Sequence, residues 1–247
     1  MSKKYKGKTC AYCGMPGASE TADHIFAREF FLEVRRANLP KVPACRTCND
    51  EKARLEHYLT GVLPFGGRHL DAQLNLATML PKRLAKNASL GPVLRSGMSP
   101  VWVPDPSGLI LRTSMVTIDA DKIERWCGLL VKGLAFHHWR TVIGPDCLME
   151  FMVPTRAGEA ILDCLLAKRG AARVSVSLGD GTFVYEGLQG TDNPQVTAWR
   201  LQVYGGLQLG GDDPGVRSGT FGVLTRPRHV QQRAGLAVEW LAGRGPT

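Results

Sequence analysis

The strongest periodicity of apolar and polar positions lies in residues 119–142, DADKIERWCGLLVKGLAFHHWRTV. Apolar side chains recur there every three or four residues, at Ile123, Trp126, Cys127, Leu130, Leu134 and Trp139. This spacing predicts a helix with one buried face, and Asp119 or Asp121 can cap its first turn. Residues 154–171 predict a second helix, because Pro154 suits its start and Gly170 suits its end.

Short segments rich in β-branched and aromatic residues follow the second helix. They cover residues 173–179, 181–189, 197–211 and 219–226. Gly, Asp and Asn separate them, and such short connections predict an antiparallel sheet. Residues 109–118 are a further strand candidate, and residues 229–243 predict a closing helix. The fold class expected for residues 108–247 is α+β, an accessory domain with two helices against an antiparallel sheet.

The first part of the chain has a different pattern. Residues 1–62 contain too few apolar positions to build a full core unaided, which predicts a small domain held together by a metal ion. Residues 63–107 are rich in Gly, Pro and basic residues, and only residues 70–80 read as a short helix. We expect this second segment to connect the first domain to the accessory domain.

Composition and charge narrow the classes of function. The chain has 247 residues, of which 44% are hydrophobic and 21% charged, so a folded protein is expected rather than a disordered one. The formal net charge of +9 favours an anionic partner such as nucleic acid. There is no signal-peptide pattern at the start and no apolar run of about 18 residues. We therefore expect a cytoplasmic protein without a membrane partner.

Four of the seven cysteines form two C-x-x-C pairs, Cys10 with Cys13 and Cys45 with Cys48. Two such pairs in one short segment are typical of a tetrahedral zinc site made of thiolates. With four sulfur ligands the site is closed, so its Zn²⁺ is expected to be structural. The remaining three cysteines lie apart in apolar surroundings and are expected to be ordinary buried residues: Cys127, Cys147 and Cys164.

Polar residues beside the cysteine pairs suggest chemistry beyond a structural zinc site. Asp23-His24 lies between the two pairs, and Asn49 directly follows the last cysteine at the start of an expected helix. Carboxylate and amide oxygens are ligands that Mg²⁺ prefers. An imidazole such as that of His24 can take a proton from water near neutral pH. Together these groups suit the cleavage of a phosphodiester bond.

At these positions the sequence resembles the HNH, or His-Me finger, endonucleases, in particular the zinc-containing branch similar to recombination endonuclease VII. The likeness covers residues 8–60, where C-x-x-C, D-H and C-x-x-C-N occur in the family's order. It implies a ββα-metal unit in which Asp23 and Asn49 hold a catalytic Mg²⁺ or Mn²⁺, His24 activates water, and the cysteines hold Zn²⁺. It also implies products with a 5′ phosphate and a 3′ hydroxyl.

The sequence departs from the family pattern on the expected helix. Many members have a His where this chain has Ala53, so Glu56, on the same helical face as Asn49, is a candidate third metal contact, and His57 is a less favoured one. A solvated helix charge is the alternative for Glu56. Basic residues flank the site, and Arg28, Arg46 and Lys52 are candidates for contact with nucleic-acid phosphates.

Two functions remain open from the sequence. The first is a metal-dependent endonuclease that hydrolyses DNA, with RNA not excluded, and the likeness to bacterial HNH proteins suggests a role against foreign or phage DNA. The second is a zinc-dependent nucleic-acid-binding or adaptor protein without catalysis. In either case the C-terminal region is a candidate for contact with a protein partner or a second copy of the chain.

Overall fold

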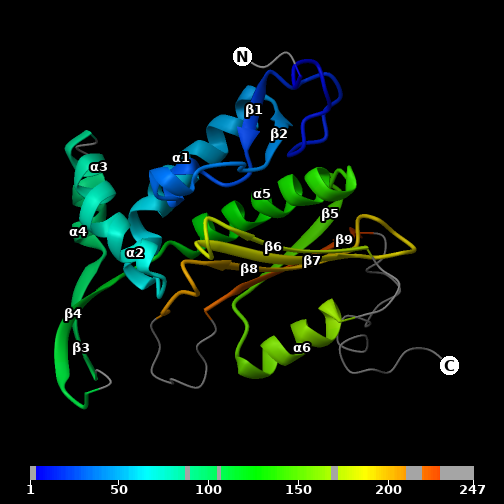
Figure 1. Ribbon diagram of the computed structural model, residues 1–247. Coiled ribbons are helices and arrows are strands. Elements are labelled where there is room, and N and C mark those ends of the chain that lie inside the picture. Colours follow the sequence, from blue (N-terminus) through cyan, green and yellow to red (C-terminus); the bar gives the residue numbers. More distant parts are fainter. Residues whose placement is uncertain (1–3, 87–89, 105–106, 168–171, 210–218, 229–247) are drawn as a thin grey trace.

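The computed structural model describes residues 4–86, 90–104, 107–167, 172–209 and 219–228. Its helices and antiparallel sheets confirm the predicted α+β class (Figure 1). The predicted closing helix at residues 229–243 lies outside the described residues, as do Gly170 and the last residues of the 197–211 segment. No helix in the described part of the chain is long and apolar enough to cross a membrane.

The N-terminal part forms a small unit of two strands and a helix. Strands β1 (Thr21–His24) and β2 (Lys41–Ala44) pair antiparallel, and α1 (Arg46–Val62) follows β2 directly. The loop between the strands contains two 3-10 turns, Arg28–Phe30 and Glu33–Arg35. This order gives a ββα arrangement with β2 leading straight into α1.

The connecting segment contains more helix than the sequence indicates. The predicted helix at residues 70–80 consists of α2 (Leu70–Leu74) and a π-helical stretch (Asn75–Met79), and it continues as α3 (Leu80–Lys86). Pro81 directly follows the π-helical stretch, in which the Leu80 N–H bonds to the Asn75 carbonyl oxygen five residues earlier, and the helix continues past it although Pro81 has no N–H of its own to donate. A further helix, α4 (Leu90–Ser96), follows.

A hairpin of two strands comes next, and it forms a sheet of its own. Strand β3 (Met98–Pro104) pairs antiparallel with β4 (Ile110–Val116). Strand β4 confirms the strand expected at residues 109–118. Its partner β3 was not expected, because Pro100 and Pro104 are residues that argue against a strand.

The long predicted helix is α5 (Ala120–Trp139), and Asp119 is its cap. The Asp119 side chain accepts a hydrogen bond of 3.2 Å from the Lys122 N–H. The second predicted helix is α6 (Arg156–Leu166), which begins two residues after Pro154 because the Thr155 hydroxyl caps the Gly158 N–H at 3.1 Å.

Five antiparallel strands form the main sheet in the order β5-β9-β8-β7-β6. Their bounds are β5 (Cys147–Met152), β6 (Ala172–Leu178), β7 (Phe183–Gln189), β8 (Thr197–Val203) and β9 (Phe221–Pro227). Helix α5 covers one face of this sheet and α6 covers the other (Figure 1). The expected packing of two helices against an antiparallel sheet is therefore present, with one helix on each face.

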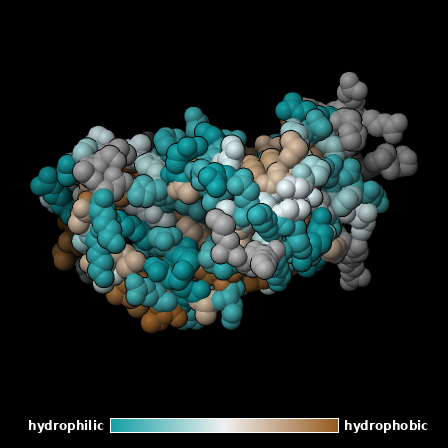
Figure 2. Space-filling model, turned by 90° about the horizontal axis from the view of Figure 1, so that it is seen from above, coloured by the Kyte–Doolittle hydropathy of each residue, from teal (hydrophilic) through white to brown (hydrophobic). Residues whose placement is uncertain are grey.

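One hydrophobic core joins the N-terminal unit to the sheet. The ring of Phe26 lies 4.3 Å from that of Phe183 on β7, and the ring of Phe30 lies 5.2 Å from that of Trp126 on α5, between centroids. Phe26 and Phe30 of the N-terminal unit are thus buried against the rest of the chain. Polar side chains cover most of the face seen in Figure 2, and apolar groups show along part of its rim.

Candidate functional site

The two cysteine pairs meet in space. The thiol sulfurs of Cys10, Cys13, Cys45 and Cys48 all lie within 4.8 Å of one another, and those of Cys13 and Cys45 are 3.9 Å apart. Tetrahedral ligands about 2.3 Å from a zinc ion have sulfurs roughly 3.8 Å apart. The predicted cluster is therefore present, and its donors suit a structural metal such as zinc. Of the predicted buried cysteines, Cys127 and Cys147 are buried, whereas Cys164 is exposed on α6.

The backbone around the cluster favours thiolate at Cys10. Burial acts to raise the pKa of the Cys10 thiol, but backbone N–H groups of Cys13, Cys45 and Tyr12 outweigh it and lower that pKa. One of these bonds runs from the Cys45 N–H to the Cys10 sulfur at 3.4 Å. Because Cys45 is the residue before α1, the cluster fixes the start of this helix against the first cysteine loop.

Asp23 lies on β1 with its side chain only 13% exposed. Its Oδ2 accepts a hydrogen bond of 2.5 Å from the Tyr12 hydroxyl and lies 3.1 Å from the Lys52 ammonium nitrogen. Burial, and then the charge of Asp23, raise the pKa of Tyr12 well above its usual range. Tyr12 is therefore a neutral hydroxyl that donates to the carboxylate.

Lys52 is fully buried beneath β1. Its ammonium group donates to the His24 carbonyl oxygen at 2.7 Å and lies 2.7 Å from Glu56 Oε1. A buried ammonium needs such partners, because the loss of water around a charge is costly. In this position Lys52 has no exposed surface to offer a nucleic-acid phosphate, unlike the surface contact expected from the sequence. It instead joins β1 to α1.

Glu56 is also buried, and this contradicts the alternative prediction that it is a solvated charge on the helix surface. Besides the contact with Lys52, its Oε1 accepts hydrogen bonds from the Ala27 N–H at 3.1 Å and the Trp126 indole N–H at 3.4 Å. Burial raises the pKa of Glu56 to about 7, although Lys52 opposes this change. These bonds engage Oε1 and hold Glu56 against β1 and α5, so Oε2 is the oxygen that a metal contact would have to use.

His24 ends β1, one residue after Asp23, and pairs with Lys41 on β2. Burial, and then the positive charge of Lys41, lower the pKa of the His24 imidazole. The ring is therefore neutral at physiological pH. A neutral imidazole that is partly exposed has the protonation state of a general base.

The other candidate residues surround this strand at the surface. Asn49 is partly exposed in the first turn of α1, and Arg28 is exposed in the 3-10 turn after β1. Arg46 is exposed too, and its guanidinium lies 3.5 Å from Glu20 in an ion pair. Such exposed pairs contribute little to stability, so Arg46 can exchange this partner for another anion.

A catalytic divalent ion at Asp23 and Asn49 is compatible with the donor chemistry of these side chains. Tyr12 and Lys52 already hold Oδ2 of Asp23, so Oδ1 is the carboxylate oxygen left for a cation. The buried Lys52 charge acts against a second cation close to Oδ2. Among the described residues, only the four cysteines gather three or more potential Cys, His, Asp or Glu ligands.

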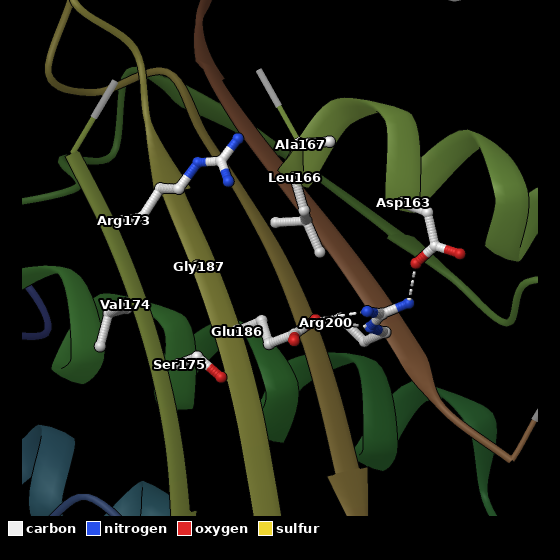
Figure 3. Close-up of a pocket in the computed structure, with 9 residues that line it drawn as sticks. All are labelled: Asp163, Leu166, Ala167, Arg173, Val174, Ser175, Glu186, Gly187 and Arg200. Atoms are coloured by element: carbon white, nitrogen blue, oxygen red, sulfur yellow. Dashed lines mark hydrogen bonds and ion pairs between the residues drawn. The ribbon is translucent and has the colours of Figure 1, made fainter. Parts of the chain in front are cut away.

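A second polar cluster lies between α6 and the face of the main sheet that α6 covers, on the side away from α5 (Figure 3). Arg200 on β8 donates hydrogen bonds to Glu186 at 2.9 Å and to Asp163 on α6 at 2.5 Å. The Arg200 guanidinium pairs with both carboxylates and so ties α6 to the sheet. This depression is thus explained by packing of the accessory region.

Comparisons of the chain with protein-family models, curated proteins and solved structures found no match. Function is therefore inferred from the residues around β1 and α1. Sequence reasoning missed the buried contacts of Lys52 with Asp23 and Glu56. One signal was present, because Lys52 and Glu56 are four residues apart and share a helix face with Asn49.

Proposed function

We propose that the protein is a metal-dependent endonuclease that hydrolyses phosphodiester bonds in DNA. One observation carries the proposal: the Asp23-His24 pair ends a strand whose antiparallel partner leads through Cys45 into the helix that bears Asn49. The cluster of four cysteines lies at that junction. A carboxylate, an imidazole and an amide thus belong to one small ββα unit.

In this proposal His24 removes a proton from the attacking water. Its lowered pKa keeps the imidazole neutral, and Lys52 fixes the backbone of His24 through the carbonyl oxygen. Tyr12 and Lys52 likewise fix the orientation of Asp23. Exposed cations at Arg28 and Lys41, near His24 in sequence or strand register, suit contact with the phosphate backbone.

Asp23 and Asn49 are the residues that would hold a catalytic Mg²⁺ or Mn²⁺. When bound, such an ion supplies stabilisation of the charge that develops on the phosphoryl and leaving oxygens. A Zn²⁺ ion held by Cys10, Cys13, Cys45 and Cys48 would have a separate, structural role, because four sulfur ligands would leave no open position for a substrate. Removal of Zn²⁺ is therefore expected to disturb the position of Asn49 rather than the chemistry itself.

A second candidate function is nucleic-acid binding without catalysis. The ion pair between Asp23 and the buried Lys52 favours it, because this carboxylate is already partly neutralised within the protein. In that case the zinc-stabilised unit presents its basic residues to nucleic acid, and the Asp23 carboxylate stabilises the fold.

Nicking of supercoiled plasmid DNA in Mg²⁺ or Mn²⁺ distinguishes the two functions. Wild-type protein is compared with His24→Ala and with the control Glu124→Ala, which changes an exposed residue on α5. The endonuclease proposal predicts nicking by wild type and Glu124→Ala, loss in His24→Ala, and loss on chelation of Mg²⁺. Equal nicking by His24→Ala and wild type, or none by either, would reject it.

A further inference from the structure

The last turn of α5 carries two adjacent histidines, His137 and His138, which are both partly buried. Helix α5 lies between the N-terminal unit and the main sheet (Figure 1). The ring of His138 points to the sheet, where its Nε2 lies 3.0 Å from the hydroxyl of Tyr185 on β7. The planes of the two histidine rings are 88° apart, and neighbouring helix positions point in different directions. His137 is therefore free to contact a different element.

Gly133 marks the place where α5 packs closely on the N-terminal unit. A Cβ atom built on Gly133 would lie 3.2 Å from Cγ1 of Ile25 and 3.4 Å from the ring of Tyr12. Ile25 directly follows His24 in the chain. Residues four apart share one face of a helix, so His137 lies one turn beyond Gly133 on the same side of α5. Because α5 also packs against β2, this side of the helix faces the strand opposite His24.

The register of β1 and β2 turns the carbonyl groups of His24 and Lys41 outward. These two residues lie directly opposite each other. At the next position along, the Ile25 N–H bonds to the Pro40 carbonyl oxygen at 3.0 Å. Opposite pairs in an antiparallel ladder alternate between hydrogen-bonded and non-hydrogen-bonded. His24 and Lys41 are therefore a non-hydrogen-bonded pair, whose side chains lie close together and whose carbonyl oxygens point away from the partner strand.

Each of these two outward carbonyl groups meets a donor from a different helix. The His24 oxygen accepts a hydrogen bond of 2.7 Å from the buried Lys52 on α1. The Lys41 oxygen accepts one from the imidazole of His137 on α5. Burial, and then the charge of Arg140, lower the pKa of His137, although the Lys41 oxygen opposes this change. The ring is therefore neutral at physiological pH and has one N–H to donate.

We propose that His137 is a positioning residue for the cleavage reaction and acts through the Lys41 backbone. It holds β2 directly opposite His24, so that the His24 imidazole keeps its place relative to Asp23 and the attacked phosphate. This role rests on the endonuclease function proposed above. It also gives the accessory region a part in the reaction, because α5 is anchored to the main sheet through His138 and supports the candidate site from outside the ββα unit.

Three substitutions of His137 separate this role from general packing. His137→Leu removes the ring N–H, whereas His137→Asn and His137→Gln each keep an amide N–H in place of Nδ1 or Nε2. Nicking kinetics on supercoiled plasmid are measured for these variants, wild type and the exposed α5 control Glu124→Ala. His137→Leu is expected to lower kcat roughly 10- to 100-fold with little change in KM, because misplacing a reacting group by about 1 Å costs about 100-fold. One of the two amide variants is expected to recover most of this loss.

Hydrogen exchange measures the contact independently of catalysis. The Ile25 and Val42 amides bond across the strand pair on either side of His24 and Lys41. His137→Leu is expected to speed their exchange about fivefold or more, because the Lys41 carbonyl loses its partner and the pair opens more often. Exchange of the β8 amides in the main sheet is expected to stay unchanged. Equal acceleration of both sets would indicate general destabilisation and overturn the proposal.

The two measurements distinguish failure of this role from failure of the endonuclease function. An active wild type whose kcat is matched by His137→Leu overturns the role of His137 alone. Equal losses in all three His137 variants also overturn it, because the N–H group is then not what matters, and so does unchanged exchange at Ile25 and Val42. An inactive, zinc-loaded wild type rejects the endonuclease function and the catalytic role of His137 with it, whereas faster exchange in His137→Leu would still show the contact with β2.

Discussion

Replacement of Lys52 by Met is a direct perturbation of the buried network under β1. Methionine keeps an unbranched, apolar side chain of similar length and removes the ammonium group. The ammonium is fully buried and lies 3.1 Å from Asp23 Oδ2 and 2.7 Å from Glu56 Oε1. Lys52→Met therefore removes the shared cation of two buried carboxylates.

The expected loss follows from what each carboxylate can do without Lys52. Removal of one partner from a buried ion pair costs about 3–5 kcal/mol. Glu56 limits this cost, because its pKa is already about 7 and it takes up a proton once Lys52 is absent. Asp23 keeps its hydrogen bond from Tyr12. We expect the free energy of unfolding to fall by about 3 kcal/mol at neutral pH, toward the lower end of that range.

Urea denaturation with Zn²⁺ present measures this change through the midpoint and the slope of the transition. Arg54→Met is the matched control, because Arg54 is an exposed cation on the same helix. The control is expected to change stability by less than about 0.5 kcal/mol. A loss below about 1 kcal/mol in Lys52→Met would refute the reasoning, because an unpaired buried carboxylate costs more than that.

Further substitutions test the cluster, the buried carboxylate and the helix cap. Cys45→Ala is expected to lose zinc, measured by atomic absorption, and to lower the melting temperature; unchanged zinc content and melting would refute the metal site. The pKa of Glu56, about 7, lies above the unfolded value of about 4.3, so ionised Glu56 lowers wild-type stability progressively as pH rises between these values. Glu56→Gln should therefore gain about 3 kcal/mol relative to wild type between pH 4.3 and 7 in urea titrations, and parallel pH profiles would contradict this. Asp119→Ala is expected to cost about 1 kcal/mol by calorimetry, because the Lys122 N–H loses its cap, and an unchanged melting curve would be inconsistent with that role.

Features encoded by local patterns could be predicted from the sequence. Helix α5 follows from the spacing of its apolar residues, and its cap Asp119 precedes the first of them. The cysteine cluster could be predicted because two C-x-x-C pairs in one short segment are the usual ligand spacing of a four-cysteine metal site. These predictions needed no knowledge of contacts between distant segments.

Features set by distant contacts could not be predicted in the same way. Lysine is rarely fully buried, so the sequence favoured an exposed Lys52, and only the packing of α1 beneath β1 encloses it. Strand β5 pairs with β9, far along the chain, and no turn signal joins the two. Strand β3 contains two prolines that are tolerated because one of its edges is open.

The chemistry of the cut ends tests the proposed function most directly. Wild-type protein and His24→Ala of equal zinc content are incubated with supercoiled plasmid and Mg²⁺, and the products are then treated with DNA ligase. The proposed mechanism predicts that wild type produces nicked circles that ligase reseals, because the ends carry a 5′ phosphate and a 3′ hydroxyl, and that His24→Ala leaves the plasmid supercoiled. Intact plasmid after incubation with zinc-loaded wild-type protein in Mg²⁺ and in Mn²⁺ would contradict the endonuclease function.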